Sequence, residues 1–95
     1  MEFDPDRPYR CSPALALRPE PFGALAYHFG TRRLSFLKST KLVEVVRSLE
    51  HQPSAAAALV AAEVGPEEHR TYLAALARLA EAGTIEPRPP GPPPR

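Results

Sequence analysis

The first half of the chain alternates apolar and polar residues with a period of two, which is typical of strands because successive side chains point to opposite faces. Three such runs cover residues 14–18, 22–29 and 33–38. The segments between them contain Pro19 and Gly30, which favour turns. This spacing predicts a three-stranded antiparallel meander in which the third run is an edge strand.

The third run has two distinct faces. Leu34 and Phe36 share one face, whereas Ser35 and Leu37 lie on the other. Leucine and phenylalanine are among the residues most often buried in proteins. The default expectation is therefore that Leu34 and Phe36 belong to the hydrophobic core.

The second half of the chain changes to apolar spacings of three and four residues, the pattern of amphipathic helices. Helices are predicted over residues 40–50, 54–64 and 66–82, and residues 84–86 suit a short final strand. Serines precede the first two helices and glycines follow the last two, as helix caps. The predicted fold class is α+β: a winged helix-turn-helix with an N-terminal three-stranded antiparallel sheet and three helices.

Proline marks the limits of the folded unit. Of the 13 prolines, five lie in the first 21 residues and six in the last nine. Proline lacks a backbone N–H and interrupts helices and inner strands. We therefore expect a flexible N-terminal segment over residues 1–12, a single domain over residues 13–86, and a proline-rich, disordered tail over residues 87–95.

Charge and side-chain chemistry argue against several classes of function. The 12 lysines and arginines nearly balance 11 aspartates and glutamates, whereas a nucleic-acid-binding domain is usually basic. The single cysteine and three scattered histidines predict no metal site and no cofactor. The only aspartates, Asp4 and Asp6, lie in the proline-rich start, so no catalytic constellation is expected. No apolar run is long enough to cross a membrane, and a cytoplasmic location is expected.

The predicted edge strand is the strongest candidate for a binding surface, because an edge offers unpaired N–H and C=O groups to an extended peptide. The third helix would form the floor of the peptide groove. The predicted peptide-binding residues are Arg33, Leu34, Ser35, Phe36, Leu37, Lys38, Tyr72, Leu76 and Leu79.

Arg32 and Arg33 could pair with acidic residues of that peptide, although solvated turn charges are the simpler interpretation. By the same standard Tyr72 and Leu76 are core residues by default, and Lys38 blocks unwanted strand pairing. A proline at Ser35 would test strand addition if the Ser35 N–H points outward.

Two stretches, residues 17–29 and 32–39, resemble the PqqD-like family of peptide-recognition modules, and most closely its mycofactocin branch. The string Arg-Arg-Leu-Ser-Phe-Leu-Lys-Ser at residues 32–39 is the more specific of the two, and the resemblance covers about residues 9–88. It implies a winged helix-turn-helix fold with an N-terminal three-stranded sheet and no catalytic activity.

The same resemblance implies the partners. Members of this family hold the leader of a ribosomally made precursor peptide against the third strand and third helix. They present the peptide to a radical S-adenosylmethionine enzyme. In the mycofactocin pathway the peptide would be MftA-like and the enzyme MftC-like, with no nucleic acid and no membrane involved.

A winged-helix DNA-binding protein is the alternative from a different class. It would need a basic recognition helix. The third predicted helix carries Arg70 and Arg78 with His69, against three glutamates, and is therefore nearly neutral. A small enzyme is a third possibility, for which no constellation of residues is visible.

Overall fold

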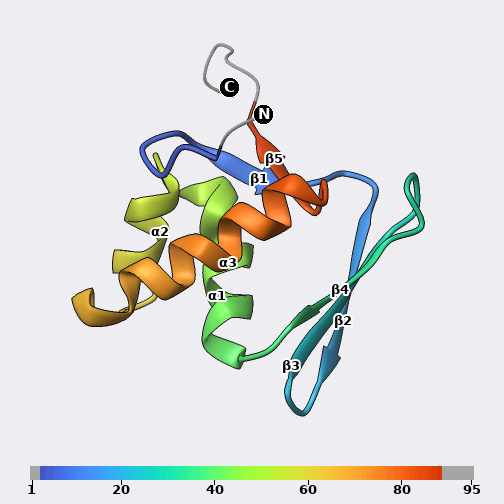
Figure 1. The fold of residues 1–95 in the computed structure, drawn as a ribbon, viewed down its shortest axis with the longest axis horizontal. Helices are drawn as coiled ribbons and strands as arrows, with labels where there is room; N and C mark the ends of the chain where they lie inside the picture. Colours follow the sequence, from blue (N-terminus) through green and yellow to red (C-terminus); the bar gives the residue numbers. More distant parts are fainter. Residues whose placement is uncertain (1–2, 89–95) are drawn as a thin grey trace.

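The computed structural model describes residues 3–88, which form three helices and two antiparallel sheets, a mixed α+β fold as predicted (Figure 1). In chain order the elements are β1 (Tyr9–Cys11), β2 (Leu15–Glu20), β3 (Gly23–His28), β4 (Leu34–Leu37), α1 (Thr40–Ser48), the 3₁₀ turn η1 (Leu49–His51), α2 (Ala55–Ala61), the 3₁₀ turn η2 (Pro66–Glu68), α3 (His69–Glu81) and β5 (Ile85–Pro87).

The predicted three-stranded meander is present, with the order β2-β3-β4, and β4 is an edge. In Figure 1 this sheet projects to one side of the helices, with β4 the strand nearest to them. One predicted boundary is wrong: β2 continues through Pro19 to Glu20 instead of stopping at Arg18. Pro19 lies opposite Ala24 on the outermost strand, at a non-hydrogen-bonded pair, so its missing N–H takes no donor from the β2–β3 ladder.

The two faces of the sheet are assigned differently from the default expectation. Ala24, Ala26 and Leu37 are buried against the helices. Leu34 and Phe36, in contrast, are 53% and 56% exposed. The default placement of Leu34 and Phe36 in the core is therefore wrong, because only one face of β4 can be covered by the helices and Leu37 occupies it.

The helices start where the serine caps predict. Ser39 Oγ accepts the Leu42 N–H at 3.0 Å, and Ser54 Oγ accepts the Ala57 N–H at 3.0 Å. Their ends differ from the prediction. The second helix stops at Ala61 because Glu63 adopts a left-handed conformation with φ 62°.

Residues 9–11, predicted to lie in the flexible N-terminal segment, instead form β1 and pair with β5. The predicted final strand is thus present, and its partner comes from the other end of the chain. Tyr9 is 1% exposed and joins the core, so the ordered unit begins before residue 13. Residues 1–2 and 89–95 lie outside the described residues, and most of the predicted proline-rich tail falls there.

Thr84 connects the end of α3 to both sheets. The Gly83 N–H donates to Ala80 O at 3.1 Å and the Thr84 N–H to Leu79 O at 2.9 Å, a Schellman motif with Gly83 at φ 81°. The Thr84 carbonyl then accepts the Ser12 N–H at 3.0 Å. Its hydroxyl lies 3.3 Å from the hydroxyl of Ser35 in β4.

His28 fixes the turn between β3 and β4. Its Nδ1 accepts the N–H groups of Gly30 and Thr31, both at 3.1 Å. Since Nδ1 is an acceptor, Nε2 carries the proton and donates to Ser12 Oγ at 3.1 Å. The hairpin tip is therefore tied through Ser12 to Thr84 and the end of α3.

Gly23 should be essential to the position of β4. A Cβ atom here would lie 2.0 Å from the Leu37 carbonyl oxygen, and the residue has φ 151°. We expect Gly23→Ala to lower the free energy of unfolding by about 1–3 kcal/mol or more, because strain adds to a backbone clash. Urea denaturation measures this loss.

Gly65→Ala is the matched control for that substitution. Its Cβ would meet only the flexible carboxylate of Glu67, and its φ is an ordinary −63°. We expect little change in stability. Equal losses in the two variants would contradict the proposed constraint at Gly23.

The two faces of β4 should differ sharply in their contribution to stability. We expect Leu37→Ala, at a fully buried position, to cost about 2–5 kcal/mol. Phe36→Ala should cost less than about 1 kcal/mol, because most of that side chain is already in water. Chemical denaturation of both variants checks this, and a larger loss at Phe36 than at Leu37 would refute the assignment of faces.

Candidate functional site

A groove of about 450 Å³ lies between β4 and α3. One wall comes from the end of β4 and the start of α1, and the other from one side of α3 and the turn before it. The lining residues are Phe36, Lys38, Ser39, Leu42, Glu68, Thr71, Tyr72, Ala75, Arg78 and Leu79.

Four of the predicted peptide-binding residues line this groove: Phe36, Lys38, Tyr72 and Leu79. Leu37 and Leu76 do not, because both are completely buried and belong to the core. Arg33 immediately precedes β4, and Leu34 and Ser35 are the first two residues of that strand. The structure therefore separates the predicted set into groove residues, core residues and residues of the strand edge.

The sequence prediction missed the polar members of the groove, of which Arg78 and Thr71 are the most prominent. These residues share one side of α3 with Tyr72, Ala75 and Leu79, at spacings of three and four residues. That spacing was sufficient to place Thr71 and Arg78 beside the apolar groove residues. It was missed because only apolar residues were counted in the helical stripe.

The backbone of β4 presents a free edge to this groove. The Phe29 N–H donates to Ala14 O at 2.8 Å and the His28 N–H to Arg33 O at 2.9 Å. Odd residues of β3 therefore pair with β2, and even residues pair with β4. With Leu25 opposite Phe36 and Tyr27 opposite Leu34, the backbone groups of Leu34 and Phe36 point away from β3.

The same alternation shows whether a proline at Ser35 can test strand addition. Ser35 lies opposite Ala26, so its backbone groups point towards β3. A proline there would remove a donor from the β3–β4 ladder and not from the free edge. Phe36 is the position at which a proline tests the edge itself.

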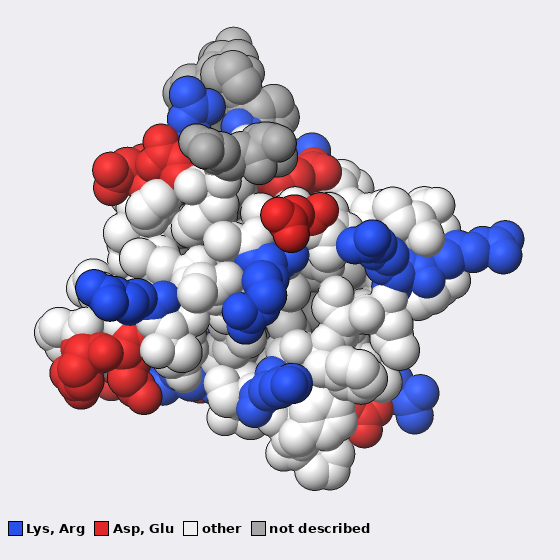
Figure 2. Space-filling view, in the orientation of Figure 1, with Lys and Arg blue, Asp and Glu red and all other residues white. Residues whose placement is uncertain are grey.

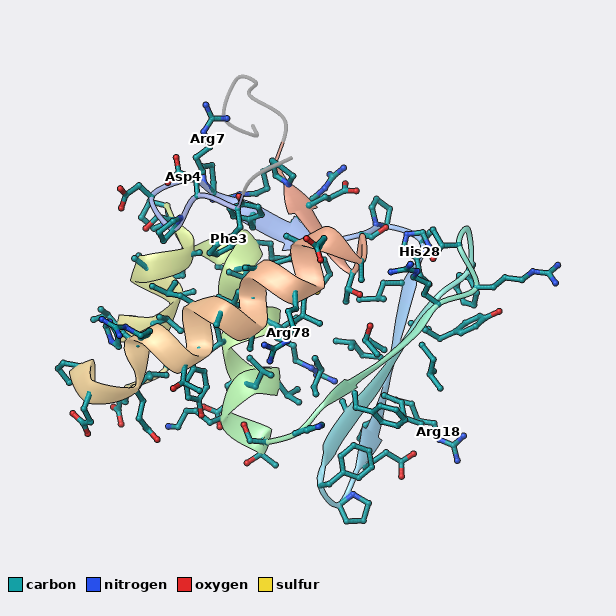
Figure 3. The ribbon with its side chains drawn as sticks, in the orientation of Figure 1. Phe3, Asp4, Arg7, Arg18, His28 and Arg78 are labelled. Atoms are coloured by element: carbon teal, nitrogen blue, oxygen red, sulfur yellow. The ribbon has the colours of Figure 1, made fainter. Side chains whose placement is uncertain are left out.

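The groove carries a positive charge at its β4 end. Lys38 and Arg78 both line it, and neither forms an ion pair with a carboxylate within residues 3–88. Figure 3 shows Arg78 extending from α3 towards β4. In Figure 2 basic side chains gather over this region, while acidic ones cluster around the start of α3. Glu68, at that other end, is the single acidic lining residue.

Cys11, outside the groove, lies in a setting that suits a structural role and not a catalytic one. Cys11 lies in β1, 3.8 Å from the Val46 carbonyl oxygen. Burial, reinforced by the nearby Glu50 carboxylate, raises the pKa of the Cys11 thiol, which keeps it protonated and unreactive at neutral pH. Within the described part of the chain, no three His, Cys, Asp or Glu residues are placed to hold a metal ion.

Within residues 3–88, none of the helices has the length and apolar character needed to span a bilayer.

The groove and edge belong to a chain with clear relatives. The model of the Peptide chaperone MftB family matches residues 8–86. The peptide chaperone MftB of Mycobacterium ulcerans is 52% identical over 86 residues, which cover 90% of this chain and 79% of the relative. That of Mycolicibacterium smegmatis is 51% identical over 87 residues, covering 92% and 85%.

The peptide chaperone MftB of Mycobacterium tuberculosis is 49% identical over 87 residues, which cover 92% of this chain and 80% of the relative. No solved structure matches the chain significantly. The family match includes β1 and β5 as well as the sheet and helices that form the groove. The predicted resemblance is therefore confirmed: the chain belongs to the peptide chaperone MftB family, which is non-catalytic.

Proposed function

We propose that this protein is a peptide chaperone of mycofactocin biosynthesis. It binds the leader of a ribosomally made precursor peptide by strand addition along β4 and presents the peptide to a radical S-adenosylmethionine enzyme. One observation carries this proposal: the free backbone edge of β4 borders a groove floored by α3, with the Phe36 side chain more than half exposed beside it.

Strand addition accounts for the two kinds of surface in the groove. A peptide laid along residues 33–38 would form about four backbone hydrogen bonds, each worth about 0.5–1.5 kcal/mol net. Alternate side chains of the added strand would point towards α3 and contact Tyr72 and Leu79. Burying two or three apolar side chains contributes about 1.5–3 kcal/mol each.

Ordering a disordered leader opposes these gains. The net result is compatible with an affinity near micromolar, roughly −8 kcal/mol. Such an affinity suits a delivery protein, because the peptide must also be released. Backbone pairing supplies binding at any sequence, whereas the α3 side of the groove selects the side chains.

Charge gives the groove a preference among peptides. Lys38 and Arg78 flank the apolar floor without carboxylate partners among the described residues. A carboxylate on the bound leader would supply that partner, and Arg33 lies on the same edge. The favoured peptide therefore combines apolar residues with at least one acidic residue.

The proposal extends to setting and fold. The three helices with the β1–β5 ladder suit a winged helix-turn-helix. The protein acts in the cytoplasm, together with an MftC-like enzyme. DNA binding is disfavoured by a specific feature of α3. Glu67 and Glu68 immediately precede it, and the N-terminal end of a recognition helix is the part that approaches the DNA.

A proline at Phe36 should weaken leader binding more than an alanine does. Both substitutions remove the aromatic ring, but only Phe36→Pro also removes the outward N–H. We expect leader affinity to fall about two- to tenfold further in Phe36→Pro than in Phe36→Ala, the effect of one hydrogen bond. Calorimetric titration with the leader-only peptide measures the difference, after circular dichroism has shown both variants to be folded.

The wild-type protein is titrated in the same series with the full-length precursor and with its leader alone. Binding of both near micromolar places recognition in the leader. No heat with either peptide would refute the chaperone proposal, whereas equal affinity of the two Phe36 variants would refute strand addition at this position only.

Reversal of the groove charge should weaken binding in a salt-dependent way. We expect Arg78→Glu to reduce leader affinity about fivefold in low salt, because it replaces an attraction by a repulsion, and less in high salt. Arg70→Glu, on the same helix but outside the groove lining, is the matched control. Equal effects of the two substitutions would contradict a specific role for Arg78.

A further inference from the structure

The outward face of the central strand β3 carries larger apolar side chains than its core face. In β3 the buried residues are Ala24 and Ala26, while Leu25 and Tyr27 point away from the helices. Directly across from them in β4 are Phe36 and Leu34. A sheet with one solvated face normally carries polar residues there. This reversal indicates a face that is covered by something else.

The same face continues beyond the strands. Phe22 is 44% exposed and its ring lies 6.2 Å from that of Phe36. Phe29 is 60% exposed and packs edge-on against Tyr27 at 5.4 Å. We call this patch the outer sheet face: Phe22, Leu25, Tyr27, Phe29, Leu34 and Phe36. Its aromatic rings are already packed against one another, so little side-chain entropy remains to be lost on binding.

The outer sheet face has a basic rim. Arg18 lies opposite Leu25 on β2, and Figure 3 shows it pointing away from the helices. Arg32 and Arg33 stand at the tip of the β3–β4 hairpin. Between residues 12 and 43 the single acidic residue is Glu20, which pairs with Arg18 at 3.1 Å. An apolar centre with cations around it fits a protein surface that has an apolar centre and carboxylates around it.

We propose that the outer sheet face is the docking surface for the radical S-adenosylmethionine enzyme, through an apolar patch rimmed by Asp and Glu on that enzyme. This inference rests on the proposed function, which supplies the partner, and it adds where that partner binds. The peptide groove lies between β4 and α3, and the outer sheet face shares only Phe36 with its lining, so most of the enzyme surface is separate from the leader surface.

Two other occupants fit the charges less well. A second copy of this chain in a two-fold dimer would bring the same patch against itself and place basic rims close together. A lipid surface would favour apolar residues at the hairpin tip, where this chain has Arg32 and Arg33. The aromatic centre is instead of the kind that dominates binding between folded proteins.

The test compares enzyme binding with leader binding in the same variants. The double variant Tyr27→Ser/Phe29→Ser removes exposed rings that lie outside the groove lining. We expect its affinity for the pathway's radical S-adenosylmethionine enzyme, measured by biolayer interferometry, to fall at least about tenfold. Leader affinity, measured by calorimetry, should stay within about twofold.

Val60→Ser is the matched control, because Val60 is 66% exposed on α2 and far from the sheet in sequence. It should bind both partners as the wild type does. Arg18→Glu is a second variant that leaves the apolar centre intact, and its side chain is 79% exposed. It should also weaken the enzyme complex, whereas Arg70→Glu should not.

Each remaining outcome overturns the inference in a recognisable way. If the wild type binds the leader and the enzyme but the outer-face variants bind the enzyme equally well, the docking surface lies elsewhere. If the wild type binds the leader but not the enzyme, the presenting role fails and the inference with it. If the wild type dimerises in sedimentation and Tyr27→Ser/Phe29→Ser does not, the occupant is a second copy of this chain. If the wild type binds phosphatidylglycerol vesicles and the double variant does not, the occupant is a membrane.

Discussion

The position of β4 beside α3 depends on the contacts made by Thr84. The Schellman motif at the end of α3 places this residue with its carbonyl towards Ser12 and its hydroxyl towards Ser35. Ser12 in turn holds His28, and His28 holds the tip of the β3–β4 hairpin. Two points along the projecting sheet are thus tied to one helix end. Thr84 itself is 1% exposed, so its own hydrogen bonds are largely shielded from water and hold β4 beside the end of α3.

The second constraint is the small size of the residues on the inner face of β3. Gly23 approaches the Leu37 carbonyl so closely that a methyl group would clash, and Ala24 and Ala26 let β3 lie near α1. Close approach buries Leu37 but leaves the sheet little apolar area to contribute to the core. The larger residues, Leu34 and Phe36 among them, lie on the opposite face. A small domain has few such residues to leave uncovered, which indicates that their exposure serves binding and not folding.

Much of this architecture follows from the local sequence, and the parts that do not are those that depend on distant contacts. The three strands, the serine caps and the edge position of β4 are encoded within short stretches. So are four of the groove residues, Phe36, Lys38, Tyr72 and Leu79. The period of two separates Leu37 from Leu34 and Phe36, but it cannot say which side is inward when both sides are apolar. Pairing of β1 with β5 joins residues 9–11 to 85–87, and no local pattern in either segment specifies the other.

In the proposed binding mode, one edge strand serves two partners because its free backbone groups and its outward side chains make different kinds of contact. The polar groups of Leu34 and Phe36 point along the sheet plane towards the groove, while their side chains stand on the outer face. Adding a peptide strand uses the backbone groups and leaves the outward side chains available. It also lengthens the sheet by one strand, so that the peptide's own outward side chains become continuous with the outer sheet face. A surface built in this way offers a docking partner both the chaperone and its bound leader, since the two then share one hydrogen-bonded sheet.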